Sequence, residues 1–218
     1  MPAQSAPGLL LVMVDIPTAL EADFNHLYDT LHLPEVVAVP GVLGGRRYQA
    51  LEDGAPKYQA LYDLERADVV ESAAFQEMTQ HQNEWSQRIR PQFQNLQRGV
   101  FTQIHPAAQD TPPAPTEVGG VLLVGLRVPS ERDEEFNVWY NTEHLPFLAA
   151  VPGVLRARRF AAVDDPKKYL AVYELSDPDV PQSAAFQKAA NTPWTARQRP
   201  VFQFWVRLRS RALAAVTA

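Results

Sequence analysis

Short apolar runs open each half of the chain. Residues 9–16 and 121–128 are almost continuously apolar, and each run ends at a proline, Pro17 or Pro129. A short apolar run bounded by a helix breaker is typical of a buried strand. Each half therefore begins with a predicted β-strand.

A helical stripe follows each predicted strand. Phe136, Tyr140, His144 and Leu148 recur every four residues, which places them on one face of a helix. The segment Val-Pro-Gly at 151–153 ends that helix and turns the chain. The first half repeats the pattern with Phe24, Tyr28, His32 and Val36 and the turn at 39–41.

The rest of each half predicts three more strands and one more helical region. Alternation with a period of two is typical of strands that bury one face. The expected order is βαββαβ, the ferredoxin-like α+β unit with an antiparallel sheet. The strands are expected at 42–51, 57–64 and 98–105 and at 154–163, 168–175 and 201–209, with helical regions from Ser72 and Ser183.

The two halves are copies of one module. Residues 24–50 align with 136–162 without a gap, and 16 of the 27 positions are identical. Between the copies lies a segment rich in proline and alanine, which is typical of a linker. We therefore expect a first repeat at 1–105, a linker at 106–118 and a second repeat at 119–218.

Each predicted sheet needs a cover for the face that its helices leave bare. The tandem copy can supply it, so we expect an intramolecular pseudo-dimer in which one sheet packs on the other. The space between the sheets and under the helices is the natural place for a ligand cavity. Association into a further homodimer stays open.

Composition and charge limit the classes of molecule that the protein is expected to bind. The chain of 218 residues is 46% hydrophobic and 21% charged, and it has no apolar run long enough to span a membrane. Its net charge of -5 argues against nucleic acid, which attracts a concentrated basic surface. The chain has no cysteine and lacks a basic segment before its first apolar run, so a cytoplasmic location and a small neutral or anionic ligand are expected.

One motif resembles a known family. The segment Trp-Tyr-Asn-Thr-Glu-His-Leu-Pro at 139–146, followed by Val-Pro-Gly-Val-Leu and Arg-Arg-Phe up to residue 160, resembles the EthD-like branch of the dimeric α/β barrel superfamily. The resemblance implies action on a small, often aromatic molecule, because members include cyclases, lactone isomerases, cofactor-free oxygenases and degradation proteins. Relatives of this barrel also bind haem, but nothing in this sequence marks an axial ligand, and no cofactor is expected.

His144 is the candidate catalytic base. It is an ionisable group in an otherwise apolar and aromatic stripe, and burial favours the neutral imidazole that can accept a proton. Tyr140, one turn away, could orient or protonate a substrate oxygen. The alternatives are a core histidine bonded to the backbone and a tyrosine that only packs on the sheet. His32 and Tyr28 are the equivalent candidates in the first copy.

Three further residues of the motif are candidates for substrate binding. Trp139 could be a platform for a ligand or a core residue. Asn141 and Glu143 point away from the stripe, so they are expected at the mouth of a cavity or at a contact between the copies. The first copy has Leu27, Asp29 and Leu31 at these positions, and the loss of the tryptophan and the glutamate favours the second copy as the working site.

Paired arginines on the second strand of each copy are candidates to bind an anion. One of Arg158 and Arg159, and one of Arg46 and Arg47, must face the interior because neighbours on a strand point to opposite sides. An inward guanidinium could hold a carboxylate or enolate oxygen. The alternatives are an ion pair with Glu174 or Asp63, or a surface position.

Other repeated residues are expected to support the fold. Tyr62 and Tyr173 are predicted to form an apolar wall, with Tyr173 also a candidate to contact substrate. Arg90 and Arg199, each followed by proline, are expected to form a helix-to-strand corner.

Several enzyme classes are excluded by missing motifs. The sequence has no glycine-rich phosphate loop, no serine in a nucleophile elbow and no zinc-protease spacing among its histidines, and no metal site is expected. Three functions remain. The first is a cofactor-independent isomerase, lyase or cyclase that uses a histidine base. The second is a small-molecule binding or carrier protein without catalysis, and the third is a cofactor-free oxygenase.

Overall fold

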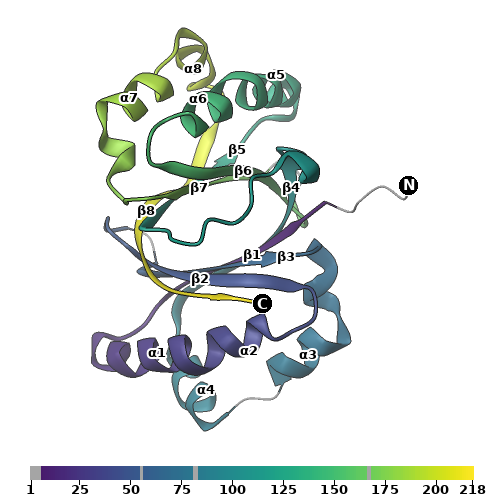
Figure 1. Ribbon diagram of the computed structural model, residues 1–218, viewed down its shortest axis with the longest axis vertical. Helices are drawn as coiled ribbons and strands as arrows, with labels where there is room; N and C mark the ends of the chain where they lie inside the picture. Colours follow the sequence, from purple (N-terminus) through teal and green to yellow (C-terminus); the bar gives the residue numbers. More distant parts are fainter. Residues whose placement is uncertain (1–5, 55, 81–82, 166–167) are drawn as a thin grey trace. The chain divides into compact units, whose positions relative to one another are not determined.

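The computed structural model divides into two compact units (Figure 1). It describes residues 6–54, 56–80, 83–165 and 168–218, without the side chains of residues 84 and 85. The first unit runs to Thr102 and also takes in Leu213–Ala218, and the second is Gln103–Ala212. The ends of the two longest strands therefore each belong to the other repeat's unit.

The first unit has the expected βαββαβ order. Its antiparallel sheet has the strand order β4-β1-β3-β2. The elements are β1 Gly8–Asp15, α1 Glu21–Leu27, a π-helical turn Tyr28–His32, α2 Leu33–Val37, β2 Val42–Ala50, β3 Tyr58–Leu64, α3 Ala73–Gln80, α4 Glu84–Ile89 and β4 Gln94–His105.

The second unit repeats that order. Its sheet has the order β8-β5-β7-β6, also antiparallel. The elements are β5 Gly120–Arg127, α5 Asp133–Trp139, a π-helical turn Tyr140–His144, α6 Leu145–Ala149, β6 Val154–Ala162, β7 Lys168–Leu175, α7 Ala184–Ala190, α8 Pro193–Gln198 and β8 Gln203–Thr217.

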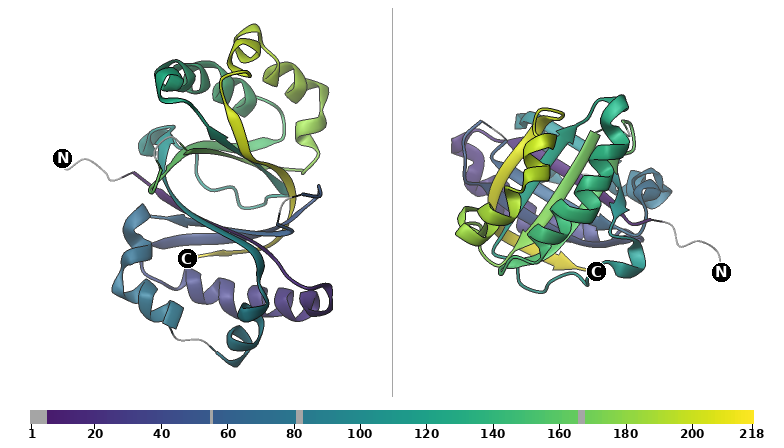
Figure 2. Two further views of the ribbon diagram at one scale, coloured as in Figure 1. Left: turned by 180° about the vertical axis from the view of Figure 1, so that it is seen from behind. Right: turned by 90° about the horizontal axis from the view of Figure 1, so that it is seen from above.

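In each unit the helices cover one face of the sheet (Figures 1 and 2). The core between them is built from the alternating inward residues of the strands and the stripe of the helices. In the second unit Phe136, Tyr140 and Leu148 are all buried there, as the four-residue spacing predicts. Phe24, Tyr28 and Val36 form the matching core in the first unit.

The two-copy α+β prediction is confirmed. In each unit the four described strands form one antiparallel sheet, in the order β4-β1-β3-β2 in the first and β8-β5-β7-β6 in the second. The last residues of β8 join the first unit, where the Ala218 N–H donates to the Leu43 carbonyl at 3.3 Å. Two such α+β units in one chain are what the internal repeat predicts.

Three local features differ from the predicted elements. The helical stripe is interrupted by a π-helical turn in both units. The second helical region is two short helices, α3 and α4 or α7 and α8. The last strands are longer than the apolar pattern indicates, because β4 begins at Gln94 and β8 continues to Thr217.

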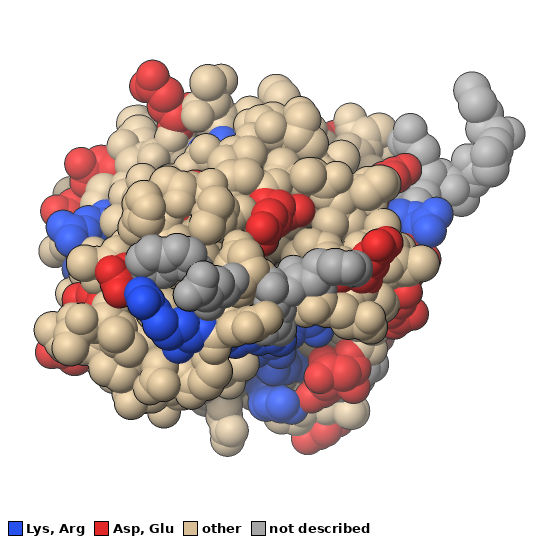
Figure 3. Space-filling model, turned by 90° about the horizontal axis from the view of Figure 1, so that it is seen from below, with Lys and Arg blue, Asp and Glu red and all other residues tan. Residues whose placement is uncertain are grey.

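The outer surface carries both signs of charge. Figure 3 shows Lys and Arg side chains interspersed with Asp and Glu side chains on one face, separated by wide uncharged areas. In the part of the chain that is described, no helix is both long and apolar enough to cross a membrane.

Candidate functional site

A π-helical turn positions the candidate tyrosine and histidine in each unit. In the second unit the Leu145 N–H reaches back to the Tyr140 carbonyl, five residues earlier. The next residue, Pro146, has no N–H to donate, so an ordinary helical ladder cannot continue through it. The widened turn leaves the rings of Tyr140 and His144 edge to face, with centroids 4.9 Å apart.

The second unit has a cavity of about 100 Å³ between its sheet and its helices. Strands β5, β7 and β8 form one wall, and the π-helical turn with α5 to α8 forms the other. Most of the lining is apolar or aromatic. The residues that the argument uses are Trp139, Tyr140, His144, Tyr173, Thr195, Arg199, Phe202 and Arg207.

Two tyrosine hydroxyls meet at this cavity. The hydroxyl oxygens of Tyr140 and Tyr173 lie 3.0 Å apart, and burial raises the pKa of both groups. Both hydroxyls therefore keep their protons at neutral pH. One of the two protons serves the bond between the tyrosines, which leaves the other available to an oxygen of a ligand.

A chain of hydrogen bonds leads from Glu143 to the imidazole of His144. Thr192 donates its hydroxyl to Glu143 Oε1 at 2.5 Å, and its oxygen lies 3.0 Å from the hydroxyl of Thr195. Thr195 Oγ1 lies 3.4 Å from Nδ1 of His144. Thr192 has one hydroxyl proton, so once that proton is given to the Glu143 carboxylate, only the Thr195 hydroxyl can donate in the contact between the two threonines.

The direction of these bonds and the tautomer of the imidazole are linked. When the Thr195 hydroxyl donates to Thr192 it can only accept from the ring, and this arrangement corresponds to a His144 with its proton on Nδ1. Nε2 then holds a free lone pair, and no described residue hydrogen-bonds to it. Burial first, and then the positive charges of Arg159 and Arg199, lower the pKa of His144 to about 4. The imidazole is neutral at physiological pH.

The first unit has a larger cavity, of about 160 Å³, in the equivalent place. Leu27 lines it where the second unit has the bulkier Trp139, which accounts for part of the difference in volume. Tyr28 and Tyr62 pair at 3.4 Å, and burial, with the charges of Arg90 and Arg47, lowers the pKa of His32 to about 4.

The hydrogen-bond chain of the second unit is missing from the first. Leu31 stands in place of Glu143, and Asn83 and Ser86 stand in place of the two threonines. Within the described residues, Ser86 bonds to Asn83 through its backbone and nothing bonds to the imidazole of His32. The first cavity thus keeps the histidine and the tyrosines without the means to orient the ring.

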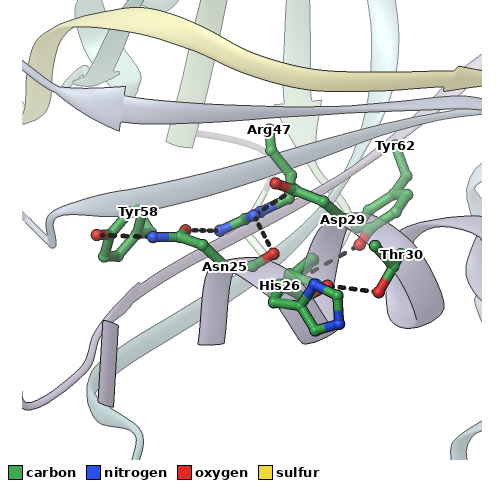
Figure 4. A network of polar contacts seen from close by, with 8 residues as sticks. Asn25, His26, Asp29, Thr30, Arg47, Tyr58 and Tyr62 are labelled. Carbon is green, nitrogen blue, oxygen red and sulfur yellow. Dashed lines mark hydrogen bonds and ion pairs between the residues drawn. The ribbon is translucent and has the colours of Figure 1, made fainter. Parts of the chain in front are cut away.

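One arginine of each predicted pair points to the helices but is held away from the cavity. Figure 4 shows Arg47 reaching from β2 to Asn25 and Asp29, with Asn25 Oδ1 at 2.9 Å. Its guanidinium carbon also lies 4.3 Å from the centre of the Tyr28 ring. A buried cation that is this fully bonded holds the helix on the sheet and has few donors left for a ligand.

Arg159 does the same in the second unit. It donates to Asn137 Oδ1 at 2.9 Å and to Asn141 Oδ1, and its guanidinium carbon lies 4.3 Å from the centre of the Tyr140 ring. Burial lowers its pKa to about 10, which leaves it charged at neutral pH. Asn141 is therefore a partner of this arginine and does not line the cavity.

The other arginine of each pair lies on the opposite face of its strand. Arg158 is buried 3.8 Å from Glu174, which also binds Arg156 at 2.8 Å, so the ion pair that the sequence left open is present. Arg46 is half-buried on β2. Neither Arg158 nor Arg46 lines the described cavities.

The described cavities thus bring together part of the predicted site and add residues that the sequence did not indicate. His144, Tyr140, Tyr173 and Trp139 meet in one cavity, and His32 and Tyr28 meet in the other. Glu143 does not line the cavity of its unit, and it accepts a hydrogen bond from Thr192. Polar lining residues that the sequence did not indicate include Ser86, Arg90 and Arg98 in the first unit and Thr195, Arg199 and Arg207 in the second. Among these six, only Arg90 and Arg199 had stood out in the sequence, as a repeated pair expected at a helix-to-strand corner.

The cavities do not fit a haem. Cofactor pockets of roughly 300–1,000 Å³ are usual, and these are about 100 and 160 Å³. Beside His144, Trp139 and Phe202 stack with centroids 6.2 Å apart, so aromatic side chains fill the space that a porphyrin would need. Among the described residues no group of three or more His, Asp or Glu side chains is placed to hold a metal ion.

Among known proteins, the matches to this chain are solved structures. No family model and no curated protein matches the chain. A protein provisionally described as a monooxygenase, from Fusobacterium nucleatum, is similar with a TM-score of 0.68 at 11% identity, over 98% of this chain and 95% of that one. An anthrone oxidase-like protein gives 0.67 at 11% identity, over 99% and 94%.

A third solved structure has the same arrangement. A variant of chlorite dismutase from Candidatus Nitrospira defluvii gives a TM-score of 0.64 at 9% identity, over 97% of this chain and 92% of that one. At such low identity these likenesses concern the fold alone. The chain has the tandem fold of the dimeric α/β barrels, in which two ferredoxin-like repeats occupy one polypeptide.

Proposed function

We propose that the second unit catalyses a cofactor-independent proton transfer on a small aromatic or lactone-like molecule, with His144 as the base. The reaction class is that of an isomerase, lyase or cyclase, in keeping with the EthD-like motif at 139–160. Proton abstraction next to a carbonyl is the step that needs a neutral imidazole and a donor to the developing oxyanion.

The observation that carries the proposal is the chain Glu143–Thr192–Thr195–His144. In the proposed arrangement Glu143 takes the Thr192 proton, Nδ1 of His144 carries the ring proton, and Nε2 is the atom that takes a proton from the substrate; the contacts along the chain support this arrangement. A carboxylate at the far end of the chain also stabilises the imidazolium that forms, as an orienting acid does in other histidine-based catalysts. Glu143, Thr192 and Thr195 are positioning residues in this scheme, because they act through the histidine.

Tyr140 supplies the second chemical group. Of the two hydroxyl protons in the Tyr140–Tyr173 pair, one is free to hydrogen-bond a carbonyl oxygen in the cavity. Because the surroundings are apolar, a hydrogen bond to a developing negative charge is stronger there than in water. The tyrosine and the histidine together would bind the oxygen and remove the proton of an enolisable substrate.

A second candidate, ligand binding without chemistry, is favoured for the first unit. Its cavity is the larger of the two, and it lacks both the tryptophan and the chain that orients the histidine. The first unit is therefore proposed to bind a molecule of the same kind while the second unit carries out the reaction.

Exchange of carbon-bound hydrogen with deuterated solvent tests the proposed reaction. Small aromatic ketones, phenols and lactones would be incubated with the protein in D₂O, and loss of the C–H signal followed by proton NMR. Exchange by the wild type that falls ~10²–10⁴-fold in His144→Ala and stays within a few-fold in His32→Ala supports the proposal. Equal exchange in wild type and His144→Ala contradicts it, and oxygen consumption on substrate addition would favour a cofactor-free oxygenase instead.

A further inference from the structure

Each unit places two arginines at the edge of its cavity. Arg199 and Arg207 line the cavity of the second unit, and Arg90 and Arg98 line that of the first. The positions are equivalent in the fold, because Arg207 pairs with Val124 on β5 and Arg98 pairs with Val12 on β1. A duplicated module has kept the same pair of cations beside both cavities.

The cations are not balanced by acidic groups in the described lining. In the second unit no Asp or Glu lines the cavity. In the first unit Glu35 lines it, but this residue is exposed and accepts a hydrogen bond from Asn83 at 3.3 Å. The arginines therefore give two mainly apolar cavities a positive electrostatic potential.

The guanidinium groups have donors to offer. The guanidinium groups of Arg90, Arg98 and Arg207 make no hydrogen bond or ion pair with the described residues, and the guanidinium group of Arg199 bonds only to Asn191. Burial lowers the pKa of Arg98, and the charge of Arg90 is one of the causes that lower the pKa of His32. The charges are thus felt inside the cavity although the arginine side chains reach solvent.

We propose that both cavities select a small aromatic anion, whose ring lies among the apolar and aromatic side chains and whose carboxylate or enolate oxygen is bound by the arginine pair. This inference rests on the proposed function, because it names the substrate class of the same cavities. Guanidinium groups suit carboxylates, since two parallel N–H donors match two oxygens. In the second unit the anion would bring its reacting carbon beneath Tyr140 and His144.

Matched pairs of charged and neutral ligands test the inference. The probes are 4-fluorobenzoate with 4-fluorobenzamide and 2-naphthoate with 2-naphthamide, titrated into the full-length protein and followed by fluorine or proton NMR at low and at high salt. The carboxylate is expected to bind about tenfold to a hundredfold more tightly than its amide, and the preference is expected to shrink at high salt.

Variants of the arginines test whether these residues cause the preference for the carboxylate over its amide. Arg98→Gln combined with Arg207→Gln is expected to remove it, because both side chains are exposed and their loss should leave the fold intact, which thermal unfolding checks. Arg132→Gln is the control, since Arg132 is partly exposed, pairs with Glu135 and lines neither described cavity. Equal affinity for acid and amide, no binding of either at millimolar concentration, or an unchanged preference in the double variant would each overturn the inference.

The same titrations separate this inference from the proposed function. His144→Ala should keep the preference for the carboxylate while losing proton exchange. A protein that prefers the anion but never exchanges a proton contradicts the reaction and leaves the anion selectivity standing. A protein that exchanges protons on neutral substrates and binds acid and amide equally contradicts the anion selectivity alone.

Discussion

The hydroxyl oxygens of Tyr140 and Tyr173 lie 3.0 Å apart at the wall of the second cavity, on a helical turn and a strand that the chain separates by 33 positions. Because one hydroxyl donates to the other, only one of the two tyrosines keeps its proton free for a ligand. In the first unit the equivalent bond runs from Tyr62 to Tyr28, so the helix tyrosine accepts and keeps its own proton free. Tyr140 is expected to hold the same role in the second unit.

Tyr140→Phe should therefore cost more activity than Tyr173→Phe. Removing a donor to a developing oxyanion lowers kcat by ~10²–10³. Tyr173→Phe removes a bond that only orients Tyr140, and a loss of about tenfold or less is expected by comparison. Steady-state kinetics of the two variants checks this, and a larger effect of Tyr173→Phe would reverse the assignment.

Substitutions in the hydrogen-bond chain from Glu143 to His144 are expected to lower kcat and to leave KM nearly unchanged. Thr195→Val keeps the shape of the side chain and breaks the contact with Nδ1, so the ring loses its orientation and a fall in kcat of about tenfold to a hundredfold is expected. Glu143→Gln should act in the same direction because it removes the charge at the end of the chain. Ser86→Ala, at the position equivalent to Thr195 in the first unit, is the control and should leave kcat unchanged.

Arg159 is expected to matter for stability more than for the reaction. Arg159→Met leaves the side-chain oxygens of Asn137 and Asn141 without their donor, and the free energy of unfolding should fall by about 2–4 kcal/mol. Because Arg159 does not line the cavity, turnover should stay within about tenfold. Urea unfolding and kinetics of the same variant check both statements, and a large loss of kcat with normal stability would return Arg159 to the role that the sequence indicated.

Acid should destabilise the protein through its two buried histidines. Their pKa values are about 4 in the folded chain and about 6.5 in the unfolded chain, so between these values the unfolded chain binds more protons. Stability is therefore full above pH 6.5 and falls as the pH drops toward 4, by at most about 3 kcal/mol for each histidine.

Replacement of both histidines isolates that effect from the carboxylates that titrate nearby. Urea unfolding from pH 4 to 7 should give a flatter profile for the combined His32→Gln and His144→Gln variant than for the wild type. Parallel profiles would mean that neither imidazole is kept neutral by the fold.

The fold was accessible from the sequence because its signals are local and occur twice. The apolar runs, the four-residue stripe and the Val-Pro-Gly turns each depend on neighbouring residues, and the repeat confirmed the order of the elements. The π-helical turn was not predicted, although Pro146 and Pro34 follow it, because proline shows that a regular ladder must stop without showing how the chain adapts.

The site was accessible only in part because its key contacts are not local. Glu143 meets Thr192 across 49 positions, and no pattern around either residue indicates the contact. Strand alternation showed that one of Arg158 and Arg159 faces the helices, but it could not show that Asn137 and Asn141 bind that arginine. Arg207 lies on the last strand, where a charged residue among apolar ones resembles an ordinary surface position.

The central claim is that His144 is a neutral base with its proton on Nδ1. A measurement of the protonation state of His144 tests this claim most directly, because the measurement needs no substrate. Long-range proton–nitrogen NMR of the imidazoles, with the signals assigned by loss in His144→Gln, reports which nitrogen carries the proton at each pH. The account predicts that Nδ1 of His144 is protonated, that Nε2 is not, and that the ring stays neutral until the pH approaches 4. A proton on Nε2 of the neutral ring, or titration near pH 6.5, would contradict it.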